Sequence, residues 1–280
     1  MLSATRAVAK ATETGSPLPE LDQLADLYAT FDFHPGFGEL TVIAGEPGTQ
    51  KSGFALYWVA NMGLPTLYFN ADSAMHTMVS RSVACLTGER YRDILGALET
   101  EGGQAYCEDV LSETRINYVP DPDPTLVTIQ ENIFAWVEMF DEYPKVIVVD
   151  NLMDVISGNE NEYAGYKEIL LSLKQMARTS GAAFFILHHM SEANNASEHP
   201  PPRKALMGKA AQTPENIMSV DLEGDQFRVS VVKARSGESD KTGRKFVTLL
   251  ADPARNQFRR QQSLDQQAAQ LARWREENLS

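Results

Sequence analysis

Short apolar runs alternate along the chain with segments whose apolar residues recur at helical spacing. Four of these runs end in glycine or polar residues, which is typical of strands buried on both faces of a sheet. They are 39–45 (ELTVIAG), 65–72 (PTLYFNAD), 145–155 (KVIVVDNLMDV) and 182–191 (AAFFILHHMS). Helical spacing marks 52–63, 73–88, most of 89–118, the segment after Pro124 and 164–181. The alternation predicts an α/β fold with a mainly parallel central β-sheet flanked by helices.

The pattern changes toward both ends of the chain. Residues 225–251 alternate in strand fashion around SGESDKTG, which predicts a C-terminal β-hairpin at the edge of the sheet. The apolar residues of 18–31 have helical spacing, so this helix can pack on its own domain or on a neighbouring subunit. The segment 192–205 contains three consecutive prolines and predicts a mobile loop. We expect an N-terminal arm and linker helix over 1–32, an ATPase-type domain over 33–260 and a helical tail over 261–280.

Composition adds limits to this picture. The 280 residues are 43% hydrophobic and 22% charged, an ordinary globular balance. The net charge of −13 argues against a surface coated with nucleic acid but leaves room for a local basic channel. There is no apolar run near the ~20 residues that cross a bilayer, so we expect a cytoplasmic protein without a membrane partner. Cys85 and Cys107 have no metal-type spacing and predict buried, idle thiols.

The stretch GEPGTQKS, residues 45–52, nearly matches the phosphate-binding loop G-x-x-x-x-G-K-[ST]. Gln50 occupies the position of the second glycine, and we expect it to keep a helical φ with its side chain turned away, while Gly48 supplies the flexibility. Backbone N–H groups at the start of the next helix favour phosphate, and Lys51 adds a mobile charge. The residues assigned to ATP are Gly45, Glu46, Pro47, Gly48, Thr49, Gln50, Lys51, Ser52 and Gly53, together with Asp150.

Other polar residues follow the strands that neighbour this loop, at the edge where α/β sheets bind ligands. Asp150 and Ser52 are assigned to Mg²⁺, Asp150 through water. Asp72 is placed either to orient the attacking water or to cap the following helix. His188 and His189 point to opposite faces of their strand, so one of them, which we take as His188, is a γ-phosphate sensor candidate or a satisfied core histidine.

At these residues the chain resembles the RecA-like motor domain of DnaB-type replicative helicases. The likeness runs over 33–255, and the HH strand end is similar to that of RepA-type hexameric helicases. Asp72 stands where that family usually carries a glutamate, one methylene longer, and VIVVDNLMDV resembles its Walker B strand. VVKARSG, 231–237, resembles its K-x-R-x-G element, which implies that Lys233 and Arg235 reach a neighbouring subunit's γ-phosphate. Without the family, these are two solvated residues on a hairpin.

The resemblance implies a RecA-like P-loop NTPase that forms a homo-oligomeric ring, commonly hexameric, with ATP between subunits and single-stranded DNA in the channel. The loops that would contact DNA map to SGNENEY and to 191–209, where Arg203, Lys204 and Lys209 make only a weakly basic set. About 30 residues precede the motor-like region, so we expect a single-domain phage or plasmid version that lacks the primase-recruiting domain.

The sequence therefore favours an ATP-driven DNA translocase or helicase. A recombination or repair ATPase that depends on DNA without unwinding it, and an ATP-binding scaffold with weak hydrolysis, remain as alternatives. ATP and Mg²⁺ are the expected cofactors, and replication or recombination proteins are the expected partners besides DNA.

Overall fold

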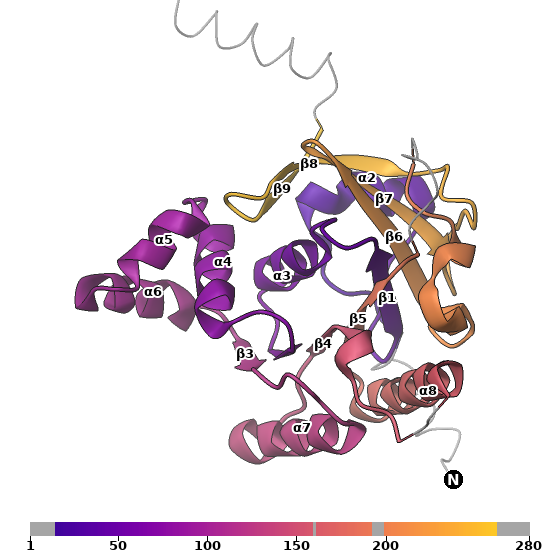
Figure 1. Cartoon of the computed structure of the whole chain (residues 1–280), viewed down its shortest axis with the longest axis horizontal. Coiled ribbons are helices and arrows are strands. Elements are labelled where there is room, and N and C mark those ends of the chain that lie inside the picture. The colour runs from indigo at the N-terminus through magenta and orange to yellow at the C-terminus, as the bar shows by residue number, and fades with distance from the viewer. Residues whose placement is uncertain (1–14, 159–160, 192–198, 262–280) are drawn as a thin grey trace, which may run out of the picture.

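A computed structural model describes residues 15–158, 161–191 and 199–261. Its centre is one nine-stranded sheet in the order β3-β2-β4-β5-β1-β6-β7-β8-β9 (Figure 1). The strands are β1 (Leu40–Gly45), β2 (Thr66–Asn70), β3 (Ile116–Val119), β4 (Val146–Asp150), β5 (Ala183–His189), β6 (Asn216–Glu223), β7 (Gln226–Lys233), β8 (Val247–Asp252) and β9 (Gln257–Arg260). The predicted α/β fold with a mainly parallel core is confirmed.

The sheet has a parallel part and an antiparallel part. The parallel part runs, in sheet order, over β3, β2, β4, β5, β1 and β6. Strands β7, β8 and β9 continue from β6 in antiparallel pairs. Every residue of β1, β2 and β4 is buried, which explains their continuous apolar character. Because parallel strands share one direction, the polar residues that end β1, β2, β4 and β5 meet at a single edge.

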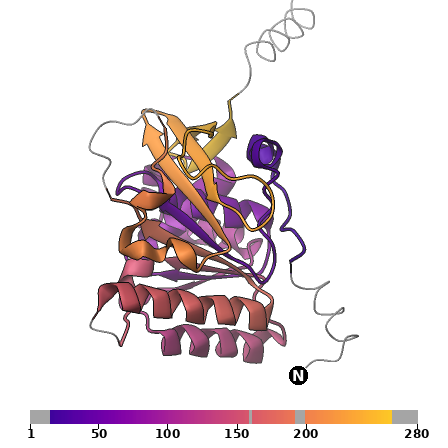
Figure 2. The ribbon, with the colours of Figure 1, turned by 90° about the vertical axis from the view of Figure 1, so that its right-hand side faces the viewer.

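Helices cover both faces of the sheet. They are α2 (Ala25–Phe31), α3 (Lys51–Met62), α4 (Met75–Thr87), α5 (Tyr91–Ala97), α6 (Glu101–Ser112), α7 (Leu126–Phe140) and α8 (Glu162–Ser180). Helices α2 and α3 bury apolar residues in one core, and α7 and α8 bury theirs in the other. Figure 2 shows α7 and α8 side by side on their face. Helices α5 and α6 pack on α4 around a smaller cluster that includes Cys107.

The N-terminal helix packs on its own domain, which decides between the two positions open at the sequence level. Leu24, Leu27 and Phe31 are fully buried in the same core as α3. The 3-10 helix η1 (Asp22–Leu24) leads into α2, and α2 ends at Asp32, whose backbone is left-handed.

Three features of the C-terminal half differ from the sequence-based expectation. The short apolar element after residue 213 is the eight-residue strand β6, and β9 was not expected at all. Part of the expected mobile loop is ordered, because Arg203–Ala205 forms the 3-10 helix η3, and Met207–Gln212 then forms η4. Proline cannot supply backbone donors, but Pro200 and Pro201 are nevertheless buried against the sheet. The expected N-terminal arm and C-terminal tail lie mostly outside the described residues.

The expected burial of the two cysteines agrees with the structure. Cys85 and Cys107 are free and buried. Among the described residues, every helix is too short or too polar to cross a membrane.

Candidate nucleotide-binding site

The phosphate-binding loop joins the end of β1 to the start of α3. Gly45 has no room for a side chain, because a Cβ atom there would lie 2.5 Å from the Val220 carbonyl oxygen and 2.8 Å from Thr49 Oγ1. Gly48 has a φ of +81°, a conformation that glycine adopts without strain. The close contacts thus require glycine at position 45, and the positive φ favours it at position 48.

The expectation of a helical φ at Gln50 is wrong. Gln50 is left-handed, with φ +61° and ψ +26°, because the loop reverses there before α3 begins at Lys51. A non-glycine residue in this region is strained by roughly 1–2 kcal/mol. Its side chain turns toward the first turn of α3, where Gln50 Oε1 lies 3.0 Å from the position of a Cβ added to Gly53. A glycine, the usual residue at this position, adopts this left-handed φ without strain. Gln50 adopts the same φ with the strain energy given above.

The N-terminus of α3 is open to an anion. Gln50 is the N-cap residue, and its side chain makes no capping hydrogen bond. The first N–H groups of a helix have no partner within the helix, and the helix dipole favours negative charge there. At the end of a loop that curls around this point, this arrangement is the one that binds phosphate.

The phosphate-binding loop itself holds the side chain of Lys51. Its Nζ donates to the Glu46 carbonyl oxygen at 2.8 Å, and the side chain is buried. Burial lowers the pKa of Lys51 to about 8, while the nearby carboxylates of Asp150 and Glu46 act in the opposite direction. A phosphate group bound beside Lys51 favours its charged form further, so phosphate binding and protonation of Lys51 support each other.

Asp150 lies where the predicted metal ligand is needed. Asp150 Oδ1 accepts a hydrogen bond from Ser52 Oγ at 3.0 Å, and Oδ2 accepts one from Tyr68 Oη at 3.0 Å. Burial raises the pKa of Asp150 to about 6, and these two hydrogen bonds and the charge of Lys51 hold it from rising further. Asp150 does not cap the turn that follows, because Asn151 caps it. Tyr68 was missed because its position in β2 looked simply apolar.

Asp72 faces the same space from the loop after β2. Its side chain is exposed and has no hydrogen bond to the described residues. The alternative role as a helix cap is not realised either, because α4 begins at Met75 with Ala74 as its N-cap. Arg81, on α4, also lines this space and was missed, since a single arginine inside an amphipathic helix carries no distinguishing pattern.

The structure separates the two histidines. His188 is fully buried; its Nε2 lies 3.1 Å from the Met207 carbonyl oxygen, its Nδ1 has no partner among the described residues, and burial lowers its pKa to about 4. His189 is half-buried and lines the cavity beside the phosphate-binding loop. Burial, and next the charge of Lys51, lower the pKa of His189. The histidine that faces the candidate phosphate site is therefore His189, the neighbour of the residue chosen from the sequence.

These residues enclose a cavity of about 240 Å³. Its lining consists of Pro47, Gly48, Gln50, Lys51, Ser52, Gly53, Asp72, Arg81, Asp150, Asn151 and His189. Sites that enclose a drug-sized ligand measure ~300–1,000 Å³, so this cavity suits a polyphosphate rather than a whole nucleotide. The oxygen donors of Ser52 and Asp150 fit Mg²⁺, which keeps several waters and takes further ligands from phosphate.

Lys233 and Arg235 do not line this cavity. Lys233 pairs with Ile217 of β6, and Ile217 pairs with Val42 of β1, so Lys233 lies short of the β1 end that carries the loop. Its Nζ donates to the carbonyl oxygens of Ala211 and Gln212, each at 2.9 Å.

Arg235 forms an ion pair with Glu215, with 3.4 Å between Arg235 Nη1 and Glu215 Oε1. The Arg235 side chain is 61% exposed, which makes it available to another molecule.

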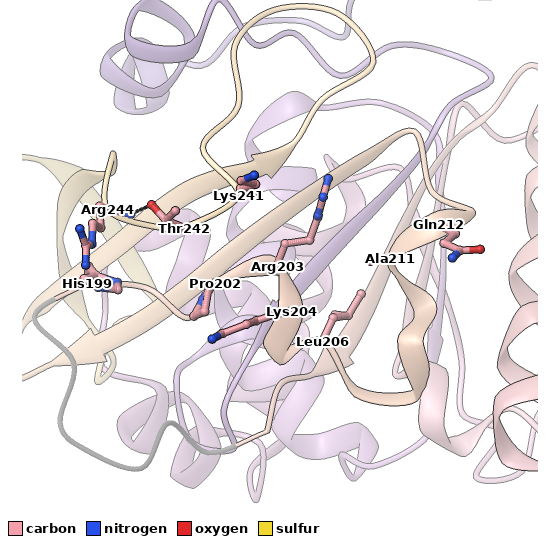
Figure 3. Close-up of a pocket in the computed structure, with 10 residues that line it drawn as sticks. All are labelled: His199, Pro202, Arg203, Lys204, Leu206, Ala211, Gln212, Lys241, Thr242 and Arg244. Atoms are coloured by element: carbon pink, nitrogen blue, oxygen red, sulfur yellow. Dashed lines mark hydrogen bonds between the residues drawn. The ribbon is translucent and has the colours of Figure 1, made fainter.

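Arg203 and Lys204, two of the three residues assigned to nucleic acid, line a second and larger cavity (Figure 3). Lys209 lies in η4, between Met207 and Gln212.

Comparison with known proteins agrees with this geometry. A family model described as an AAA domain matches residues 33–195. The gene 65 protein of Mycobacterium phage L5 is 31% identical over 243 residues, covering 84% of this chain and 90% of the relative. The gene 65 protein of Mycobacterium phage D29 is 30% identical over 218 residues, covering 75% and 94%.

Two solved structures share the fold at low sequence identity. A DnaB-like replicative helicase, described with its interactions with primase, superposes with a TM-score of 0.76 and 16% identity, covering 93% of this chain and 68% of that chain. The second, described as an ATPase domain, superposes with a TM-score of 0.74 and 15% identity, covering 92% of this chain and 96% of that chain. The fold is therefore RecA-like.

Proposed function

This chain belongs to the AAA-domain family of P-loop ATPases and is homologous to the mycobacteriophage gene 65 proteins, and on that premise we propose that it is an ATP-driven translocase on single-stranded DNA. It works as a ring-shaped homo-oligomer, commonly a hexamer, that hydrolyses ATP between subunits. The observation that carries the proposal is the assembled phosphate site, in which an uncapped helix start, a buried lysine and a hydroxyl–carboxylate pair surround one small cavity.

Each residue of the site has a defined task in hydrolysis. The N–H groups at the start of α3 bind the β- and γ-phosphates, and Lys51 exchanges its carbonyl partner for phosphate oxygen. Ser52 and Asp150 are the residues that hold Mg²⁺, which neutralises charge that develops on the phosphates. Asp72, whose carboxylate has no other described partner, orients and polarises the attacking water. Because Asp72 is shorter than glutamate, its loop must approach more closely or a second water must intervene.

The remaining groups sense and complete the site. His189 is placed to contact the γ-phosphate, and His188, buried behind it in the strand, supports the position of that strand end. Lys233 and Arg235 act on the ATP bound by a neighbouring subunit, which fits their distance from the loop of their own chain and the exposure of Arg235. Such an arginine is worth ~10³–10⁵ in rate in enzymes where it has been dissected.

A second function within the same class is that of a recombination or repair ATPase, which depends on DNA but does not unwind the duplex. The net charge of −13 argues against extensive contact with nucleic acid, and it therefore favours a function that needs less of this contact than unwinding does. Arg203, Lys204 and Lys209 supply the DNA contacts in both cases. Displacement of one strand from a tailed duplex distinguishes the two functions.

The proposal is tested by ATP hydrolysis with and without single-stranded DNA. We expect turnover that DNA stimulates in the wild type and that is lost in Lys51→Ala. Normal ATP binding without turnover in the wild type would refute both enzymatic functions and leave a scaffold role.

The role in trans has its own test. Mixtures of Arg235→Ala and Lys51→Ala subunits contain some interfaces in which both halves are intact, so activity should recover. No recovery at any ratio counts against Arg235 acting on a neighbour.

A further inference from the structure

The second cavity has two basic walls that come from distant parts of the chain. One wall is η3, which supplies Arg203 and Lys204, together with the residues just before it. The other is the connection between β7 and β8, which supplies Lys241 and Arg244. In Figure 3, His199, Thr242 and Arg244 are drawn toward one end of the cavity, and Ala211 and Gln212 toward the other. The cavity measures about 740 Å³, three times the space beside the phosphate-binding loop.

The two walls are fixed against each other by backbone contacts. The Arg203 amide donates to the Lys241 carbonyl oxygen at 3.0 Å. Gly243 packs so closely on Pro200 that a Cβ atom there would overlap the Pro200 carbonyl oxygen. Below them, Ser219 Oγ donates to the Pro201 carbonyl oxygen at 2.6 Å, which ties the first wall to the sheet. The four cationic side chains therefore project from an ordered frame.

The second wall is also shaped from within. Asp240 accepts hydrogen bonds from the Thr242 amide at 2.9 Å and from the Lys245 amide at 2.8 Å. This carboxylate is used to build the turn that presents Lys241 and Arg244. It is not among the residues that line the cavity.

Among the described residues, the lining carries positive charge without counter-charge. The described lining contains no aspartate or glutamate, and none of its four lysines and arginines forms a salt bridge with a described residue. Like charges held on a fixed frame repel one another, and an anion relieves that repulsion. In a chain with a net charge of −13, such a cluster marks a place where an anion is favoured over the rest of the surface.

The arrangement suits a sugar-phosphate backbone better than a free nucleotide. The cationic side chains are spread along the cavity instead of converging on one point (Figure 3). Arginine forks pair with phosphate oxygens in two parallel hydrogen bonds. Within the part of the chain that the structure describes, the lining contains no Phe, Tyr or Trp to stack a base, so it offers contacts to phosphates and few to bases.

We propose that Lys241 and Arg244 complete, with Arg203 and Lys204, a site for consecutive phosphodiester groups of single-stranded nucleic acid. The inference rests on the proposed function. It adds the β7–β8 connection to the loop after β5 as a second segment that binds DNA. The cavity also includes Ala211 and Gln212, whose carbonyl oxygens hold Lys233. A bound strand therefore lies next to a residue proposed to act across the subunit boundary.

The test is the salt dependence of binding to a fluorescent oligo(dT), measured by anisotropy for the wild type and for the double variant Lys241→Gln/Arg244→Gln. Each lost phosphate contact lowers the slope of log K against log salt by ~0.7 for a single strand, so we expect a slope smaller by ~1.4. Between about 50 and about 200 mM salt the variant should then lose ~7-fold less affinity than the wild type. Both side chains are exposed, so the variant should unfold at the wild-type temperature.

Controls separate this inference from the function on which it rests. Arg259→Gln removes one exposed positive charge on β9, outside the cavity, and should leave the slope unchanged. Lys241→Arg with Arg244 intact keeps both charges and should bind as the wild type does. An unchanged slope in the double variant, with normal binding by the wild type, overturns the phosphate site and leaves the translocase proposal standing.

Two further outcomes would also overturn the inference. Inorganic triphosphate that competes as well as oligo(dT) at equal phosphate concentration shows a site for free polyanions. A wild type that does not bind oligo(dT) at all refutes the proposed function and this site with it.

Discussion

Replacing Asp150 with asparagine should stabilise the nucleotide-free protein at neutral pH while abolishing hydrolysis. The carboxylate is buried, and its pKa is raised to about 6 from 3.8 in the unfolded chain. The native state therefore favours the protonated form of Asp150 more strongly than the unfolded chain does. Ionising the group inside the fold costs about 3 kcal/mol, since one pKa unit corresponds to about 1.4 kcal/mol.

The sign follows from the number of bound protons. Between pH 3.8 and about 6 the native state holds the Asp150 proton and the unfolded chain releases it, so the contribution of Asp150 to stability falls as pH rises through this window. Asparagine does not titrate. Its amide N–H₂ group faces one of the two hydroxyls that donate to the wild-type carboxylate, and it cannot accept that hydrogen bond. The loss reduces the gain in stability by ~1 kcal/mol. The net gain at about pH 7 is then ~2 kcal/mol.

The assay is urea unfolding of both proteins at several pH values between about 4 and about 7, without nucleotide or Mg²⁺. The difference in unfolding free energy, variant minus wild type, should rise by ~2.4 kcal/mol across this range, whatever the constant offset. Asp141→Asn is the matched control, because it removes an exposed carboxylate from a left-handed position that asparagine tolerates. A difference that stays flat with pH would refute the buried, raised-pKa state of Asp150.

Three other substitutions test the steric and ionic features of the fold. Gln50→Gly relieves a left-handed φ but frees the unfolded chain, so urea unfolding should show a net stabilisation of ~0.5–1 kcal/mol, and a destabilisation would contradict the strain. Gly53→Ala places a Cβ atom 2.5 Å from Asn256 Oδ1, and thermal unfolding should report a loss of ~1–3 kcal/mol. Glu215→Gln leaves three cations without their shared buried partner, including Lys174 at 2.7 Å, and should cost ~1–3 kcal/mol by the same measurement; a neutral result would show that the cluster is solvated.

The parallel core was predictable because its signals are local. In β4, four consecutive buried apolar residues lead directly into Asp150, so strand, burial and polar end lie within five positions. The loop at Gly45 could be recognised for the same reason. What places these segments at one edge is the common direction of parallel strands, which requires no further information.

The errors have physical causes that the sequence does not carry. The φ of Gln50 is set by how the loop turns into α3, a property of the backbone path and not of the residue. Strand periodicity showed that His188 and His189 face opposite sides, but it did not show which side faces the loop. The basic cavity was underestimated because Lys241 and Arg244 join Arg203 only through the antiparallel strands that follow β6.

The packing of the N-terminal helix means that the boundary of the matched family and the boundary of the folding unit do not coincide. The family match begins at residue 33, yet Leu24, Leu27 and Phe31 are fully buried beneath the sheet. Burial of three such side chains contributes ~5–9 kcal/mol, which is comparable with the whole stability of an ordinary domain. A protein truncated at residue 33 would therefore be close to unfolding.

The same helix braces the chain at two distant points. The Phe31 carbonyl oxygen accepts the Glu238 amide at 2.6 Å, Lys245 lies over the Phe31 ring, and Asp26 pairs with Arg260 of β9. Cutting the helix away would release the connection that presents Lys241 and Arg244 as well as exposing the core. Truncations of this chain should accordingly be cut ahead of residue 15, because among the described residues Gly15 and Ser16 already hydrogen-bond with Phe37 and Leu18 is buried.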